Sequence, residues 1–93
     1  MFALSQKFRP HPEVVDTELD ESEVALLHLD SKIYYSLNRT GARIWDGLKS
    51  GRTLSEISQQ LQDEFDVDSE HVERSVLALI EDLSRQDLIE VVE

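Results

Sequence analysis

The hydrophobic pattern of this 93-residue chain changes its period once, close to Asn38. Before that residue, short runs have the two-residue period of strands, and residues 23–29 are largely apolar on both faces, so both faces of that strand are expected to be covered. After it, apolar side chains recur every three or four positions, which is the spacing along one face of a helix. The chain is therefore predicted to place its main strands first and its helices second.

Three short strands are predicted in the first part of the chain, over residues 13–18, 23–29 and 32–37. An acidic turn at residues 20–22 separates the first two, and Asp30 and Ser31 supply turn-forming side chains between the second and the third. The third strand alternates, with Ile33, Tyr35 and Leu37 on one side and Tyr34 and Ser36 on the other. The last two strands are expected to form a hairpin.

The two ends of the chain are predicted to be extended. Pro10 and Pro12 exclude a helix from residues 1–12, which we expect to form an extended, loosely held N-terminal arm. Residues 88–92 are expected to form a short extended tail. We therefore predict one domain over residues 13–93, preceded by the arm.

Local signals mark the ends of three predicted helices. The first covers residues 39–49, and Gly51 lies just beyond it as a stop. Thr53 and Glu56 have the spacing of a capping box that opens the second helix. Asp68 is a suitable N-cap for the third and longest helix, which ends at residue 85 or 86. The expected fold class is α+β, a three-stranded antiparallel sheet followed by three helices, in a winged helix-turn-helix-like layout.

The charge of the chain argues against the DNA-binding function that this layout first suggests. Twenty Asp and Glu residues against nine Lys and Arg give a net charge of −11. From Asp66 to the end of the chain, nine residues are acidic and two are basic. A helix that reads DNA needs basic neighbours to hold the phosphates. A transcription regulator therefore remains only as a disfavoured alternative, and no nucleic-acid partner is expected.

Catalytic, metal and cofactor sites have no support in the sequence. His11, His28 and His71 are scattered, and the chain has no cysteine, so the three or four converging ligands of a zinc site are not apparent, although folding can gather distant residues. The three glycines form no phosphate-binding loop. We expect no enzyme activity, no metal and no cofactor. With no cysteine and no apolar run of membrane-spanning length, a cytoplasmic location without membrane contact is expected.

An interaction function remains, and the third predicted strand is the place for it. Three strands cannot close into a barrel, so the strand that leads into the helices can be left with an open edge. An extended peptide can add to such an edge through backbone hydrogen bonds, with alternate side chains in pockets beside a neighbouring helix. The apolar stripe of the third helix can line these pockets or belong to the core.

Four segments of the chain resemble the PqqD-like family, small domains that are also called recognition elements of ribosomally made, post-translationally modified peptides. They are EVALLHLD, YYSLNRTGARIWDGL, RTLSEISQQLQDEFDVD and VERSVLALIEDLSRQDLIE, and the resemblance covers about residues 14–89. The family pattern includes a Leu-Asn pair, here Leu37 and Asn38, and an Ile-Trp pair, here Ile44 and Trp45. The closing residues 87–89 resemble the broader branch, which includes lasso-peptide systems, more than the quinone-cofactor branch.

The resemblance implies that the chain binds the leader segment of a precursor peptide and presents it to a modifying enzyme, such as a radical S-adenosylmethionine enzyme or a leader peptidase. In the family the leader pairs with the third strand, against the third helix. Carried over, the implied peptide-binding residues are Lys32, Ile33, Tyr34, Tyr35, Ser36, Leu37, Val72, Ser75, Val76, Leu79, Ile80 and Leu83. A structural adaptor subunit of an enzyme complex and a homodimer formed through the open edge stay open.

Overall fold

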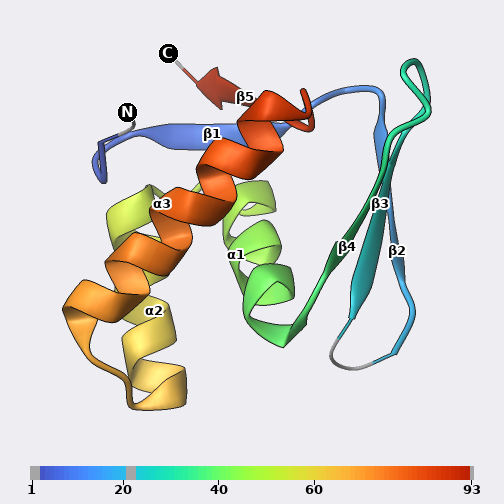
Figure 1. The fold of residues 1–93 in the computed structure, drawn as a ribbon. Coiled ribbons are helices and arrows are strands. Elements are labelled where there is room, and N and C mark those ends of the chain that lie inside the picture. The colour runs from blue at the N-terminus through green and yellow to red at the C-terminus, as the bar shows by residue number, and fades with distance from the viewer. Residues whose placement is uncertain (1–2, 21–22, 93) are drawn as a thin grey trace.

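A three-stranded antiparallel sheet and three helices form the body of the protein, in a computed structural model that describes residues 3–20 and 23–92. The strands are β2 (Val14–Glu18), β3 (Val24–His28) and β4 (Tyr34–Leu37), in the spatial order β2-β3-β4. The helices α1 (Arg39–Lys49), α2 (Leu54–Phe65) and α3 (Ser69–Arg85) follow (Figure 1). The predicted α+β architecture is confirmed.

The helix ends follow the local signals. The Asn38 side chain accepts a hydrogen bond from the backbone N–H of Gly41 at the start of α1, and Thr53 and Glu56 form the predicted capping box of α2. Asp68 occupies the N-cap position of α3, but its side chain makes no capping bond there. The predicted acidic turn at residues 20–22 includes Glu21 and Ser22, which lie outside the described residues.

The expectation of a loosely held N-terminal arm is wrong. The strand β1 (Lys7–Pro10) pairs antiparallel with β5 (Ile89–Val92), so two segments from opposite ends of the sequence lie side by side (Figure 1). Phe8 is only 2% exposed. The carbonyls of Leu4 and Gln6 accept the first backbone N–H groups of α2, which have no partner within the helix. The arm therefore forms part of the core.

The core lies where the helices meet the inner face of the sheet and the β1–β5 pair. Val24, Leu26 and Leu37 contribute from the sheet, and Ile44 and Trp45 from α1. Alternate residues of a strand point to opposite faces, so the odd-numbered residues of β3 and the even-numbered residues of β4 face outward. None of the described helices is long and apolar enough to cross a membrane.

Asp16 fixes the sheet onto α1. Its Oδ2 accepts a hydrogen bond from the Trp45 indole N–H at 2.7 Å and one from the Lys49 ammonium at 2.7 Å. The hydrogen bond and charge of Lys49 lower the pKa of Asp16, with a further contribution from Trp45, although burial opposes the shift. This junction holds the sheet against α1.

Candidate functional site

The strand β4 is at one end of the sheet and has a free backbone edge. Within the described residues it pairs with β3 alone. The His28 backbone N–H donates to the carbonyl of Ile33, so the alternation of an antiparallel pair directs the backbone groups of Tyr35 and Leu37 toward β3 and those of Tyr34 and Ser36 toward the free edge. These free groups can pair with one more strand.

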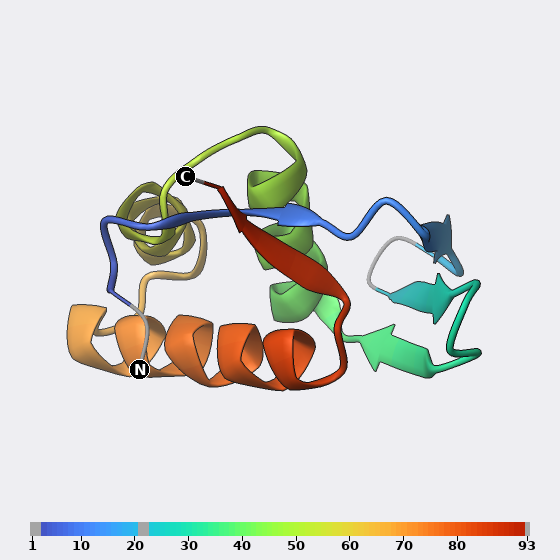
Figure 2. The same cartoon turned by 90° about the horizontal axis from the view of Figure 1, so that it is seen from above.

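A groove opens beside this edge, between β4 and α3. It holds about 580 Å³, and in the view from above β4 is the strand of its sheet that lies nearest to α3 (Figure 2). The side chains around it come from β4, α1, α2 and α3 and from the link between the last two helices. They are Tyr35, Ser36, Leu37, Asn38, Thr40, Gly41, Ile44, Leu61, Phe65, Val67, His71, Val72, Ser75 and Leu79.

Apolar side chains form much of this lining. Leu37, Ile44 and Leu61 are almost fully buried members of the core, whereas Phe65 is half-buried, and the Arg39 guanidinium stacks over its ring at 5.2 Å from the centroid. A side chain at Gly41 would place its Cβ 3.2 Å from a methyl group of Leu37. The glycine therefore keeps this part of the lining open, and the groove suits aliphatic or aromatic side chains of a ligand.

Tyr35 gives the groove a polar group beside a negative charge. Burial raises the pKa of the Tyr35 hydroxyl, and the charge of Asp82, which also accepts a hydrogen bond from this hydroxyl, raises that pKa further. Asp82 lies one helical turn after Leu79 on the same side of α3, and the Arg85 guanidinium contacts its carboxylate at 3.3 Å. A ligand in the groove thus meets a neutral tyrosine and a nearby carboxylate.

The structure brings together half of the residues that were predicted to bind a peptide. Six line the groove: Tyr35, Ser36, Leu37, Val72, Ser75 and Leu79. Val76, Ile80 and Leu83 are completely buried and pack in the core, because they lie on the face of α3 that meets the other helices. Tyr34 is 63% exposed on the opposite face of the sheet, and Lys32 and Ile33 lie in the hairpin just before β4.

Sequence reasoning missed the other eight lining residues. They are Asn38, Thr40, Gly41, Ile44, Leu61, Phe65, Val67 and His71. They belong to α1 and its N-cap, to α2, to the link between α2 and α3 and to the first turn of α3, which approach β4 only in the folded chain. The sequence contains one signal for this part of the groove, because Val67 is an apolar residue in a short polar link. In the structure its side chain is 42% exposed.

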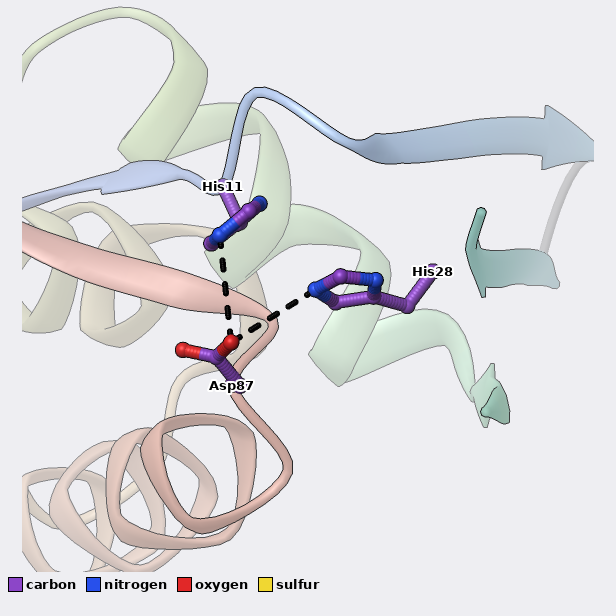
Figure 3. A group of neighbouring side chains, drawn as sticks. All are labelled: His11, His28 and Asp87. Atoms are coloured by element: carbon purple, nitrogen blue, oxygen red, sulfur yellow. Dashed lines mark ion pairs between the residues drawn. The ribbon is translucent and has the colours of Figure 1, made fainter. Parts of the chain in front are cut away.

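Folding also gathers two of the three scattered histidines. The ligand atoms of His11, His28 and Asp87 lie within 4.8 Å of one another, and the two imidazole rings are 4.6 Å apart (Figure 3). Asp87 Oδ2 is 3.6 Å from His28 Nε2 and 3.8 Å from His11 Nε2. This cluster connects the N-terminal arm, the β3–β4 hairpin and the turn between α3 and β5.

The hydrogen bonds of the cluster oppose metal binding. The Nδ1 atom of His11 accepts the backbone N–H of Glu13, and the Nδ1 atom of His28 accepts those of Asp30 and Ser31. Each neutral ring therefore carries its proton on Nε2, the atom that a metal ion would need. A histidine bound to a metal through Nε2 donates from Nδ1, and here Nδ1 faces other donors. The geometry instead suits two N–H groups directed toward one carboxylate.

Comparison with known proteins gives a consistent result. Among curated protein sequences none matches the chain. The structure of TbiB1 in complex with the TbiA(beta) leader peptide is 34% identical, has a TM-score of 0.83, and is aligned over 88% of this chain and 94% of TbiB1. Lasso peptide synthetase B1 complexed with the leader peptide is 30% identical, with a TM-score of 0.82 over 90% of this chain and 98% of that one.

The sequence match to a family model agrees with these structures and with the resemblance carried by the four segments. The model is described as coenzyme PQQ synthesis protein D (PqqD), and it matches residues 23–89, which run from the start of β3 to the start of β5 and include α1, α2 and α3. A match over so much of the sheet and all three helices identifies the chain as a member of the PqqD family.

Proposed function

We propose that this chain binds the leader segment of a ribosomally synthesised precursor peptide and delivers the peptide to a modifying enzyme, without catalysing a reaction itself. The observation that carries the proposal is the free edge of β4 beside the groove formed with α3. The edge offers backbone hydrogen bonds to an extended peptide, and the groove accepts its alternate side chains. Two structural relatives that are bound to leader peptides support the same function.

Strand addition assigns a role to each part of the site. The backbone groups of Tyr34 and Ser36 pair with the leader, and the side chains of Tyr35, Leu37, Val72, Ser75 and Leu79 contact it in the groove. Val76, Ile80 and Leu83 support the groove from the core. A dissociation constant in the micromolar range corresponds to about −8 kcal/mol, which a few backbone bonds and two or three filled subsites supply after the peptide has been ordered.

The proposed contribution to the reaction is proximity. Holding the leader raises the local concentration of the attached core peptide at the enzyme. The partner enzyme belongs to the proposal only as a class: a radical S-adenosylmethionine enzyme, a leader peptidase or another enzyme that acts on the precursor.

Titration with the precursor's leader peptide tests this function. In Leu79→Asp, a charge enters the half-exposed part of the groove, and we expect the affinity for the leader to fall about a hundredfold, because the carboxylate would have to be desolvated there. Isothermal calorimetry measures the affinity, and amide NMR shifts should centre on β4 and α3. Ala78→Asp is the matched control, since it adds the same charge at an exposed position of the same helix.

The two variants make the result decisive once circular dichroism shows that both are folded. If Leu79→Asp binds the leader with unchanged affinity, the groove is not the binding site for the side chains of the leader. Equal losses in both variants mean that charge on α3, rather than contact within the groove, governs binding. If the wild-type chain does not bind the leader but binds the enzyme directly, the adaptor function replaces leader recognition.

A further inference from the structure

The outward face of the β2-β3-β4 sheet carries a row of apolar side chains. Val15 pairs with Leu27, and Leu27 pairs with Tyr34, so the three residues form one line across the three strands. All three point away from α1, because their neighbours Asp16, Leu26 and Tyr35 point toward the core. Leu19 and Leu29 lie one residue beyond the ends of β2 and β3, where backbone hydrogen bonds to Glu23 and Glu13 continue the pairing, and they have the same parity as Val15 and Leu27. We call these five residues the outer sheet face.

Most of the exposed large apolar side chains of the molecule lie on this face. Seven such residues are exposed in the described chain, and four of them belong to the outer sheet face: Val15 (46%), Leu19 (55%), Leu29 (42%) and Tyr34 (63%). No described helix or strand covers that side of the sheet in either view (Figures 1 and 2). An apolar row that spans a whole sheet is typical of a protein-binding surface.

Acidic residues surround this row and define the charge of its partner. Residues 13–37 contain seven acidic residues and one basic residue, Lys32. This segment therefore carries −6 of the net charge of −11. Glu13 and Glu23 are exposed and have the parity of Val15 and Leu27, and Asp30 is exposed in the turn after β3. Asp16 and Glu18 are turned toward α1, where Asp16 bonds to Trp45 and Lys49. A second copy of the chain would bring an equally acidic rim, and the two rims would repel each other. Lys and Arg side chains around an apolar centre fit this face.

Tyr34 and Tyr35 separate the outer sheet face from the groove. The Tyr35 side chain lines the groove, whereas the neighbouring Tyr34 side chain projects from the other side of the sheet. A leader strand added to the edge of β4 therefore leaves the outer sheet face uncovered. A protein docked on that face would lie within one strand of the bound leader.

We propose that the outer sheet face docks the modifying enzyme through a complementary surface that has an apolar centre and a basic rim. The inference rests on the proposed function only for the identity of that partner. The binding energy of the docked enzyme comes from burial of the apolar row, and its orientation is set by the acidic rim. Leader and enzyme thus bind to the same three-stranded sheet at two separate places.

The test compares two variants of the full chain, each of which replaces two exposed aliphatic side chains by threonine. Val15→Thr with Leu19→Thr alters the outer sheet face. Val91→Thr with Val92→Thr is the matched control in the β1–β5 sheet, where the two valines are 43% and 41% exposed. Calorimetry measures the affinity of each for the purified enzyme that acts on the precursor and, separately, for the leader peptide. Light scattering reports the oligomeric state.

We expect the outer-face variant to bind the enzyme at least about tenfold more weakly than the wild type, since contacts at the centre of an interface carry most of its binding energy. Its leader affinity should stay within about twofold, and the control should keep both affinities. Enzyme affinity of the wild type should also fall as salt is added, because salt screens the acidic rim.

Three results would overturn the inference: unchanged enzyme affinity in the outer-face variant, absence of enzyme binding by the wild type, or a wild-type dimer that the outer-face substitutions dissociate. In the last case a second copy occupies the face. If the enzyme binds through the outer sheet face but the wild type does not bind the leader, the docking inference stands and the proposed function fails. The two outcomes are therefore distinguishable.

Discussion

A single carboxylate oxygen of Asp16 joins the sheet to α1 by accepting from both the Trp45 indole and the Lys49 ammonium. The partners are 29 and 33 residues away in the sequence, so local patterning gives no sign of this junction. The acidic residue lies at an inward position of β2, where an alternating strand calls for an apolar side chain. It is tolerated there because both of its donors are fixed on the adjoining helix.

Asp16→Asn should destabilise the folded chain at neutral pH. We expect a loss of about 1 kcal/mol in the free energy of unfolding, the lower part of the range for charged hydrogen bonds, because the Asp16 side chain is 33% exposed. The folded-state pKa of Asp16 lies below its ordinary value. Its contribution is therefore complete above about pH 4 and is lost as the pH falls through the lower, folded-state pKa.

Urea unfolding followed by circular dichroism at pH 7 and at about pH 3 measures this effect. The difference in the free energy of unfolding between wild type and Asp16→Asn should be smaller at the lower pH. Glu81→Gln, at an exposed position of α3, is the control and should show little difference from the wild type at either pH. If this difference in unfolding free energy is the same at both pH values, the ionised carboxylate of Asp16 is not the stabilising species.

At the scale of elements, local signals predict the helices, whereas the sequence does not predict the pairing of strands that are far apart in the chain. The bounds of α1 agree with the sequence because Asn38 and Gly51 act within one turn of its ends. The outward direction of Tyr34 and the inward direction of Tyr35 likewise follow from strand alternation. By contrast, β1 pairs with β5 across about 80 residues, and neither strand is long enough to indicate its partner. Proline at position 10 predicts extended backbone but not the burial of Phe8.

The free edge of β4 makes a prediction that concerns backbone rather than side chains. Ser36→Pro removes an N–H group that points away from β3, so the pairing within the sheet should persist. We expect the leader affinity to fall about tenfold, because one backbone hydrogen bond to the leader is lost. Calorimetry with the leader peptide measures the change.

Glu18→Pro is the matched control, because it removes the corresponding N–H group at the other free edge of the sheet, on β2. Its leader affinity should equal that of the wild type. If Ser36→Pro folds and binds the leader with unchanged affinity, strand addition to β4 is excluded, although side-chain contacts in the groove can remain. A weaker leader affinity in Glu18→Pro alone would place the leader on β2.

At the scale of the whole molecule, the sequence predicts the fold and about half of the groove. The residues of β4 and α3 were identifiable because the two elements lie at family-typical places in the chain. Ile44, Leu61 and Phe65 were assigned to helix faces without a ligand role, since their position beside β4 depends on how the helices cross. The core positions Val76, Ile80 and Leu83 share the spacing of Val72 and Leu79, so periodicity alone does not separate the buried face of α3 from its groove face.

The net charge of −11 should keep the chain monomeric at neutral pH. Near its isoelectric point of about 4.5, where the net charge is close to zero, the chain should self-associate. Protonation of the acidic rim removes the repulsion between two outer sheet faces. We expect dynamic light scattering to report larger species at that pH and fewer of them in Val15→Thr with Leu19→Thr. Association that is the same in this variant and the wild type would assign it to another surface.

The burial of Trp45 has a consequence for spectroscopy. It is the single tryptophan of the chain, it is 1% exposed, and it lies outside the lining of the groove. Its emission should be that of an indole shielded from water, and a red shift on unfolding would come from one chromophore at the junction of sheet and helix. Ligands in the groove should leave this emission nearly unchanged. Trp45 emission therefore reports loss of the fold without a contribution from occupancy of the groove.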